Sequence, residues 1–192
     1  MNVMKTVALA LLICVPSVSA RVRMLMDKSD ETPVIAPVEG KALLVFMRIT
    51  SYGFAMITDN YIDGKWIGQT KKKCYYLTEV EPGDHYLQCA YDEDDIQTEK
   101  ITFEAGKIYF FSQGLFPSGP FTTGMTIVPK TDAEAREQLP ECQYLVVGDK
   151  PGEDLEAEDY QEALEEFAEA VQEDPDSKRN TAEYKGYASF TR

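Results

Sequence analysis

Few side chains in this sequence could carry out chemistry, and they do not fall into a known catalytic pattern. His85 is the single histidine, so a Ser-His-Asp or Cys-His site would have to use it. No G-x-S-x-G nucleophile motif accompanies it. We therefore expect His85 to be a polar residue beside a turn, and we expect no catalytic residue and no cofactor.

Carboxylates are abundant, with 33 Asp and Glu residues in the chain. The acidic run Asp92–Asp95 offers the oxygen ligands that calcium prefers, but it lacks the alternating spacing and the glycine of an EF-hand loop. We expect a solvated loop there and no metal site. No two acids stand out as a pair for glycoside hydrolysis, so a secreted hydrolase with a carboxylate pair is the alternative hypothesis.

The first 20 residues have the pattern of a secretory signal peptide. Lys5 precedes the apolar run Thr6–Val15, and small residues precede a predicted cleavage after Ala20. The run is shorter than the roughly 20 apolar residues that span a bilayer. Ile13 stands before Cys14 where a lipoprotein signal has a small residue. We expect a periplasmic or secreted chain that begins at Arg21 and has no transmembrane helix.

Cleavage of the signal would leave three cysteines, Cys74, Cys89 and Cys142. An odd number allows at most one intramolecular disulfide. If the turn at Pro82-Gly83 joins two paired strands, Cys74 and Cys89 become diagonal neighbours about 7–8 Å apart, which is long for a disulfide. A bridge between Cys89 and Cys142 is an equal alternative, and so are three buried thiols.

Tight turns divide the middle of the chain into short apolar segments. Asp63-Gly64 is a strong hairpin signal because both positions accept a positive φ, and Pro82-Gly83 is a second turn signal. The predicted central hairpin is apolar on both faces, which favours a small antiparallel β-sandwich or a partly open barrel. The predicted strands are Lys41–Thr50, Phe54–Ile62, Lys65–Thr70, Tyr75–Val80, His85–Tyr91, Ile96–Glu104, Lys107–Gly114 and an edge strand Met125–Pro129.

The pattern changes at Lys130, where Thr131 and Glu134 form a predicted capping box for a short helix. A short strand is expected at Gln143–Val147, and a long amphipathic helix at Glu153–Glu173. Aromatic residues near the end of the chain should dock back onto the fold. The predicted organisation is a signal peptide at 1–20, a flexible leader at 21–40, the β-sandwich at 41–130 and an acidic helical extension at 131–192.

The chain is strongly acidic, with a formal net charge of −14. The last 62 residues contain 18 acidic and 6 basic side chains, so most of this charge lies there. Such a surface repels phosphate groups. We therefore expect no nucleic-acid partner and no attraction to an anionic membrane.

The segment from Lys41 to about Gly114 resembles a bacterial envelope family known only as domain of unknown function 2846, and more loosely the PEGA-type β-sandwiches. Members are secreted or lipid-anchored, so the resemblance implies a compact extracytoplasmic β-domain without a known activity or catalytic residues. The segments that carry the resemblance are Ala42–Phe46 with Arg48, Tyr61–Gly68, Tyr76–His85 and Glu104–Phe110.

These observations favour a non-enzymatic binding or structural module of the cell envelope over an enzyme. Its partner would be an envelope protein or a glycan, and helix 153–173 would offer a second contact surface. Aromatic side chains that the strand pattern leaves exposed would form the binding surface. The candidates are Tyr52, Phe54, Trp66, Tyr75 and Tyr86.

Overall fold

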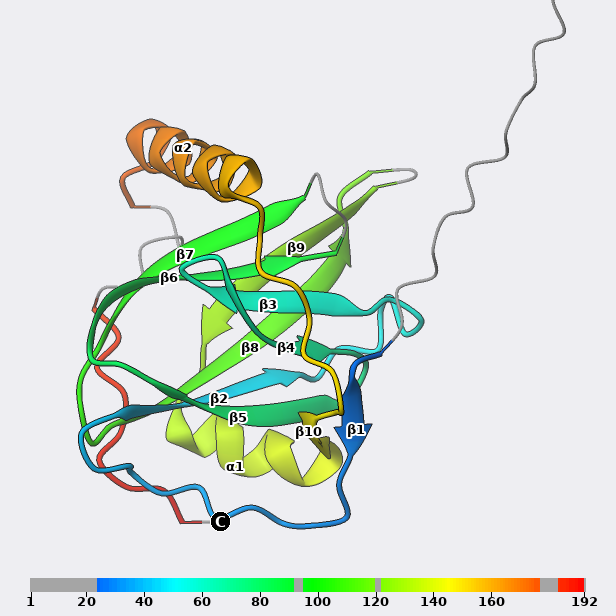
Figure 1. The fold of residues 1–192 in the computed structure, drawn as a ribbon, viewed down its shortest axis with the longest axis vertical. Helices are drawn as coiled ribbons and strands as arrows, with labels where there is room; N and C mark the ends of the chain where they lie inside the picture. Colours follow the sequence, from blue (N-terminus) through cyan, green and yellow to red (C-terminus); the bar gives the residue numbers. More distant parts are fainter. Residues whose placement is uncertain (1–23, 92–94, 120–121, 177–182, 192) are drawn as a thin grey trace, which may run out of the picture.

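The computed structural model describes residues 24–91, 95–119, 122–176 and 183–191. Two β-sheets pack face to face, and a helix lies on the outside of each (Figure 1). The strands are β1 (Met26–Lys28), β2 (Ala42–Arg48), β3 (Thr58–Ile62), β4 (Lys65–Thr70), β5 (Cys74–Val80), β6 (Gly83–Ala90), β7 (Ile96–Phe103), β8 (Ile108–Pro117), β9 (Thr123–Pro129) and β10 (Gln143–Val147). The helices are α1 (Asp132–Gln138), a 3-10 turn at Leu139–Glu141, and α2 (Ala157–Glu173).

The predicted β-sandwich class is confirmed. One sheet has six strands in the order β1-β10-β5-β2-β8-β9, and the other has four in the order β4-β3-β6-β7. Most neighbours are antiparallel, but β2 runs parallel to β8 and β5 runs parallel to β10. The six-stranded sheet is therefore mixed, which the turn pattern alone did not indicate.

The turn signals identified reversals of the chain but not always hairpins. Asp63-Gly64 does close the β3–β4 hairpin, with φ values of 51° and 74°. The predicted pairing across Pro82-Gly83 is wrong, because β5 belongs to the six-stranded sheet and β6 to the four-stranded sheet. Ala105-Gly106, between the predicted strands Ile96–Glu104 and Lys107–Gly114, does not close a hairpin either, since β7 and β8 lie in different sheets. Each of these turns carries the chain from one sheet across to the other.

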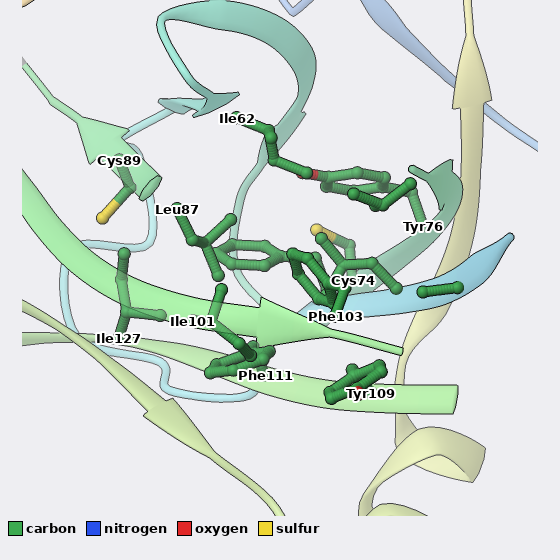
Figure 2. Close-up of a cluster of buried hydrophobic side chains, with 14 of the residues drawn as sticks. Ile62, Cys74, Tyr76, Leu87, Cys89, Ile101, Phe103, Tyr109, Phe111 and Ile127 are labelled. Carbon is green, nitrogen blue, oxygen red and sulfur yellow. The ribbon is translucent and has the colours of Figure 1, made fainter. Parts of the chain in front are cut away.

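The main core lies between the two sheets. Figure 2 shows Leu87 and Ile101 of the four-stranded sheet facing Phe111 and Ile127 of the six-stranded sheet. A second cluster covers the outer face of the six-stranded sheet, where Ala135 of α1 and residues from β2 and β8 are buried. Strand β2 is buried at every position, which explains its continuous apolar run.

The regions outside the predicted sandwich are integral to the fold. The expectation of a flexible leader is wrong for residues 24–40, because β1 pairs with β10 and Ile35 is buried in the second cluster. The capping box at Thr131 and Glu134 is confirmed, and so is the strand Gln143–Val147. Helix α2 begins at Ala157 rather than Glu153. The acidic extension therefore completes the six-stranded sheet.

Two sequence predictions fall outside the described residues. These are the signal peptide at residues 1–20 and most of the acidic loop, residues 92–94. Within the described ranges, no helix is both long and apolar enough to span a membrane.

Candidate functional site

One end of the sandwich collects exposed aromatic side chains. Strands β2, β4, β6 and β8 end there, and β3, β5, β7 and β9 begin there. We call this the loop end; it comprises the described residues 49–57, 71–73, 91, 95, 118–119 and 122. Four aromatic residues at or next to it are exposed: Tyr52 (42%), Phe54 (73%), Tyr91 (40%) and Phe116 (45%).

The loop that carries Tyr52 and Phe54 is held from below by a fully buried arginine. Arg48 Nη1 donates to the carbonyl oxygen of Met56 (2.8 Å), and Nη2 donates to those of Tyr52 (3.1 Å) and Gly53 (2.6 Å). No carboxylate forms an ion pair with Arg48 in the described part of the chain. Burial lowers the pKa of Arg48. The carbonyl dipoles of the loop therefore provide the compensation that a buried charge needs.

Gly53 fits this loop closely. Its φ is +61°, and a Cβ at this position would lie 2.7 Å from Met56 Sδ and 2.9 Å from Leu115 Cδ1. A side chain would thus strain the backbone and force the ends of the Met56 and Leu115 side chains to shift. The loop is accordingly fixed between Arg48 inside and Leu115 beside it.

Buried polar groups join the two sheets beneath the loop end. The Thr58 hydroxyl donates to Gln113 Oε1 (2.7 Å) and lies 2.8 Å from the Thr70 hydroxyl. All three side chains are at most 1% exposed. These bonds tie β3 and β4 to β8, so the loop end rests on a cross-linked interior.

The structure shows no disulfide among the three described cysteines, and burial makes their thiols poorly reactive. Burial raises the pKa of Cys74 to about 12 and that of Cys142 to about 11, and it also raises the pKa of Cys89. A nucleophilic cysteine needs the opposite shift. The predicted diagonal placement of Cys74 and Cys89 is wrong, because β5 and β6 lie in opposite sheets. A disulfide among the three stays a prediction.

Cys142 is the thiol nearest to an open surface. It is half-buried and lines a groove of about 350 Å³ whose wall also includes Tyr75 and Tyr144. Cys74 and Cys89, in contrast, are fully buried in the main core. Reagents should therefore meet Cys142 first.

His85 lies at the end of the sandwich opposite the loop end. Its Nδ1 is 2.6 Å from Asp63 Oδ2, and its Nε2 is 2.9 Å from the carbonyl oxygen of Glu81. Asp63 also accepts the backbone N–H of Tyr86 (2.9 Å). Through its two ring nitrogens, His85 links the turn at Asp63 to the turn after Glu81. This agrees with the expected role beside a turn.

Three of the five predicted surface aromatics are covered by other parts of the chain, Tyr75 fully and Trp66 and Tyr86 in part. Tyr75 is 2% exposed, and its ring centroid lies 5.3 Å from that of Tyr144. Tyr86 packs edge-on against Phe167 of α2 at 5.8 Å. A Cβ on Gly152 would overlap the Trp66 indole, so that segment lies directly on the ring. Sequence reasoning missed these covers because they come from regions assigned to a separate extension.

Two exposed aromatics at the loop end were missed. Tyr91 follows the last residue of β6, and Phe116 is the penultimate residue of β8. Each lies at the end of an apolar strand, directly before residues that favour a turn. An acidic run follows Tyr91, and Pro117 follows Phe116. An aromatic residue at such a position could have been predicted to be exposed.

Two acids bind Trp66 and have opposite pKa shifts. Trp66 Nε1 donates to Asp59 Oδ1 (2.6 Å), and the Trp66 backbone N–H donates to Asp154 Oδ1 (3.0 Å). Burial raises the pKa of Asp59, whereas the hydrogen bond from Lys65 lowers that of Asp154. Opposite shifts occur in acid–base pairs. Here, however, Asp59 holds the Trp66 ring against β3, and Asp154 fastens residues 152–155 to β4. No group of three or more possible metal ligands occurs in the described residues.

Comparisons with known proteins do not assign this chain to a family. No family model matches the chain. An uncharacterised protein of Haemophilus influenzae is 25% identical over 113 residues, which is 58% of this chain and 65% of that protein. The aligned part thus spans less than two thirds of that relative. No solved structure matches, and the resemblance to the envelope family stays a prediction.

Proposed function

We propose that this chain is a non-enzymatic binding or structural module of the cell envelope that engages an envelope protein or glycan through its loop end. The observation that carries the proposal is the exposed Phe54 on a loop held by buried Arg48. A single exposed apolar side chain is ordinary on a protein surface. Phe54, however, shares one end of the sandwich with the exposed Tyr52, Tyr91 and Phe116. Several exposed aromatic side chains at one end of a fold are typical of a contact surface.

The rigidity of the loop supports recognition. Binding by a mobile loop costs about 0.5–1.5 kcal/mol for each side chain that becomes ordered. Three hydrogen bonds from Arg48 and the close fit of Gly53 reduce that cost in advance. Burying a guanidinium is itself unfavourable, so the benefit of Arg48 lies in the loop that it orders.

The chemistry of the loop end indicates the kind of partner. Phe54 offers only apolar surface, whereas Tyr52 and Tyr91 add hydroxyl groups at the end of an apolar ring. This combination suits an apolar depression with a polar rim on a protein, or the flat face of a sugar ring. The acidic outer side of α2 provides a second surface, since its apolar residues Ala163 and Phe167 already face the chain's own sheet.

The predicted signal peptide at residues 1–20 supports a place in the envelope. The intact mass of the protein recovered from a periplasmic or culture fraction would test this part directly. A chain that begins at Arg21 is expected. An uncleaved chain recovered only from the cytosol would contradict it.

The binding proposal is tested by changing Phe54 to Ser in the full chain. Tagged wild-type protein should recover a partner from an envelope extract, and F54S should recover about tenfold less of it, as expected for a contact worth about 1.4 kcal/mol. Val34→Ser is the matched control, because Val34 is 84% exposed and adjoins Ile35, which packs in the second cluster rather than at the loop end. Equal recovery by F54S, or no protein or glycan enriched over a tag-only sample, would reject the proposal.

A further inference from the structure

One edge of β8 is shared by two segments of the chain. Strand β9 pairs with β8 from Pro117 to Phe111 and then leaves it at Pro129. Beyond that point the C-terminal segment 183–191 takes the vacated edge. The Ile108 N–H donates to the Tyr187 carbonyl oxygen (2.8 Å), and the Tyr187 N–H donates to that of Ile108 (2.7 Å).

A tyrosine hydroxyl completes the junction between β9 and this segment. Tyr184 Oη donates to the carbonyl oxygen of Lys130 (2.8 Å) and accepts the Phe110 N–H (3.1 Å). An edge N–H that β9 leaves behind is thus satisfied by a side chain of the last nine described residues. Without the segment, this part of β8 would be an open sheet edge.

Three aromatic rings at three-residue spacing hold the segment in place. Tyr184 packs edge-on against Tyr109 (5.6 Å) and Phe111 (5.4 Å). The ring of Phe190 lies 4.8 Å from that of Phe110. The Arg136 guanidinium lies 5.3 Å above the Phe190 ring and also donates to the Thr191 carbonyl oxygen.

The close approach at Gly186 makes the fit selective. Its φ is +61°, and a Cβ there would lie 2.8 Å from the Ile108 carbonyl oxygen and 2.9 Å from Tyr109 Cζ. Any other residue would have to adopt a strained backbone and displace the segment from β8. The segment therefore presents the pattern Tyr-x-Gly-Tyr-x-x-Phe.

We propose that this edge of β8 is a peptide-binding site that takes an extended Tyr-x-Gly-Tyr-x-x-Phe segment of a partner protein by strand addition, and that residues 183–191 are its resident internal ligand. Backbone bonds to a sheet edge and pockets for spaced side chains are the usual basis of such recognition. In the described residues the segment pairs with β8 through a single bridge, Ile108 with Tyr187, so its release would leave both sheets intact. The inference is independent of the loop end.

The test is a titration of a fluorescein-labelled peptide with the sequence of residues 183–191 by the full chain, followed by fluorescence anisotropy. In wild-type protein the tethered segment competes at an effective concentration that reaches the millimolar range. Gly186→Ala should free the site and tighten peptide binding by about tenfold or more. Gly40→Ala is the matched control, because Gly40 has a φ of +73° but nothing within 4 Å of its added Cβ.

Two results separate specific docking from nonspecific adsorption of the peptide. Equal binding of the peptide by G186A and G40A would overturn the proposal. A peptide in which the residues equivalent to Tyr187 and Phe190 are alanine should bind G186A at least about tenfold more weakly, since it lacks two of the three aromatic anchors. Equal affinity for the two peptides would also overturn it.

Hydrogen exchange of the unmodified chain gives a measurement that does not depend on a variant. A detachable segment opens locally at a lower free energy than the whole fold. The amides of Ile108 and Tyr187 should therefore exchange faster than those of Val45 and Phe46 in β2. Equal protection of the two sets would show an integral strand and overturn the proposal.

Discussion

Nη2 of Arg48 lies 2.6 Å from the carbonyl oxygen of Gly53, and this contact connects the fully buried end of β2 to the exposed loop at 52–56. The guanidinium has carbonyl partners from three loop residues. Its position predicts that Arg48 controls the conformation of the loop more than the stability of the sandwich.

Arg48→Met should separate these two effects. Methionine removes the desolvated charge together with the three hydrogen bonds, so we expect the free energy of unfolding to change by less than about 2 kcal/mol. The loop should lose its fixed shape, and the Met56 amide, which donates to the Gly53 carbonyl, should exchange faster with solvent. Denaturant melts combined with hydrogen exchange would measure both. A Met56 amide that stays equally protected in R48M would contradict this role.

The capping box of α1 should add a pH-dependent contribution to stability. The backbone N–H and hydroxyl of Thr131 lower the pKa of Glu134 from 4.5 to about 2. Because the folded pKa is the lower one, the stabilisation is present above pH 4.5 and is lost as the pH falls towards 2. The side chain is largely exposed, so the contribution should stay below about 1 kcal/mol.

Glu134→Gln should therefore unfold more easily than wild type at pH 6 and equally easily near pH 2. Chemical denaturation at the two pH values gives the comparison. Glu137→Gln on the same helix is the control for a general change of surface charge. A difference between wild type and E134Q that is the same at both pH values would rule out the ionised cap.

The thiols should react in a fixed order. With a pKa of about 11, only about one Cys142 thiol in a thousand is ionised at pH 8, so iodoacetamide should label it slowly. Cys74 and Cys89 should be labelled only after unfolding, because both are fully buried. Intact mass before and after denaturation would measure this. A denatured, unreduced chain with a single reactive thiol would instead reveal a disulfide.

Phe167→Ala should detach α2 from the four-stranded sheet. Phe167 is 8% exposed and packs edge-on against Tyr86, and a 17-residue acidic helix is marginal in water without such packing. We expect part of the helical circular dichroism signal to disappear while the β signal persists. Glu166→Ala, an exposed neighbour, should keep the helix, and a helical signal unchanged in F167A would mean that other contacts suffice.

The positions of the strands, turns and helices could be predicted from neighbouring residues better than which strands pair with each other. The positive φ of Asp63 and Gly64 and the capping box at Thr131 depend on a few adjacent residues, and both were predictable. The Pro82-Gly83 reversal was also found, but a turn residue does not determine whether the next strand pairs beside the last one or packs opposite it. Apolar faces on both flanking strands are compatible with either arrangement.

The candidate site was predicted only in part for a related reason. Tyr52 and Phe54 are exposed, as expected. The strand predicted from Phe54 begins only at Thr58, however, so Phe54 lies on a loop. Tyr75 looked exposed because its cover comes from Tyr144, 69 positions later in the sequence. The residues next to Tyr75 in the sequence do not indicate that contact. In the same way, the residues next to Arg48 in the sequence do not indicate that its side chain is buried.

The pairing of β1 with β10 has a consequence for how the protein is made. Met26 lies opposite Val147, and Gln143 donates to the Ser29 carbonyl across 114 positions of sequence. A growing polypeptide still attached to the ribosome at residue 140 cannot close its larger sheet, whatever its upstream strands have done. Contacts this distant along the chain also slow the search for the native state, so the chain should spend a long interval with its larger sheet incomplete.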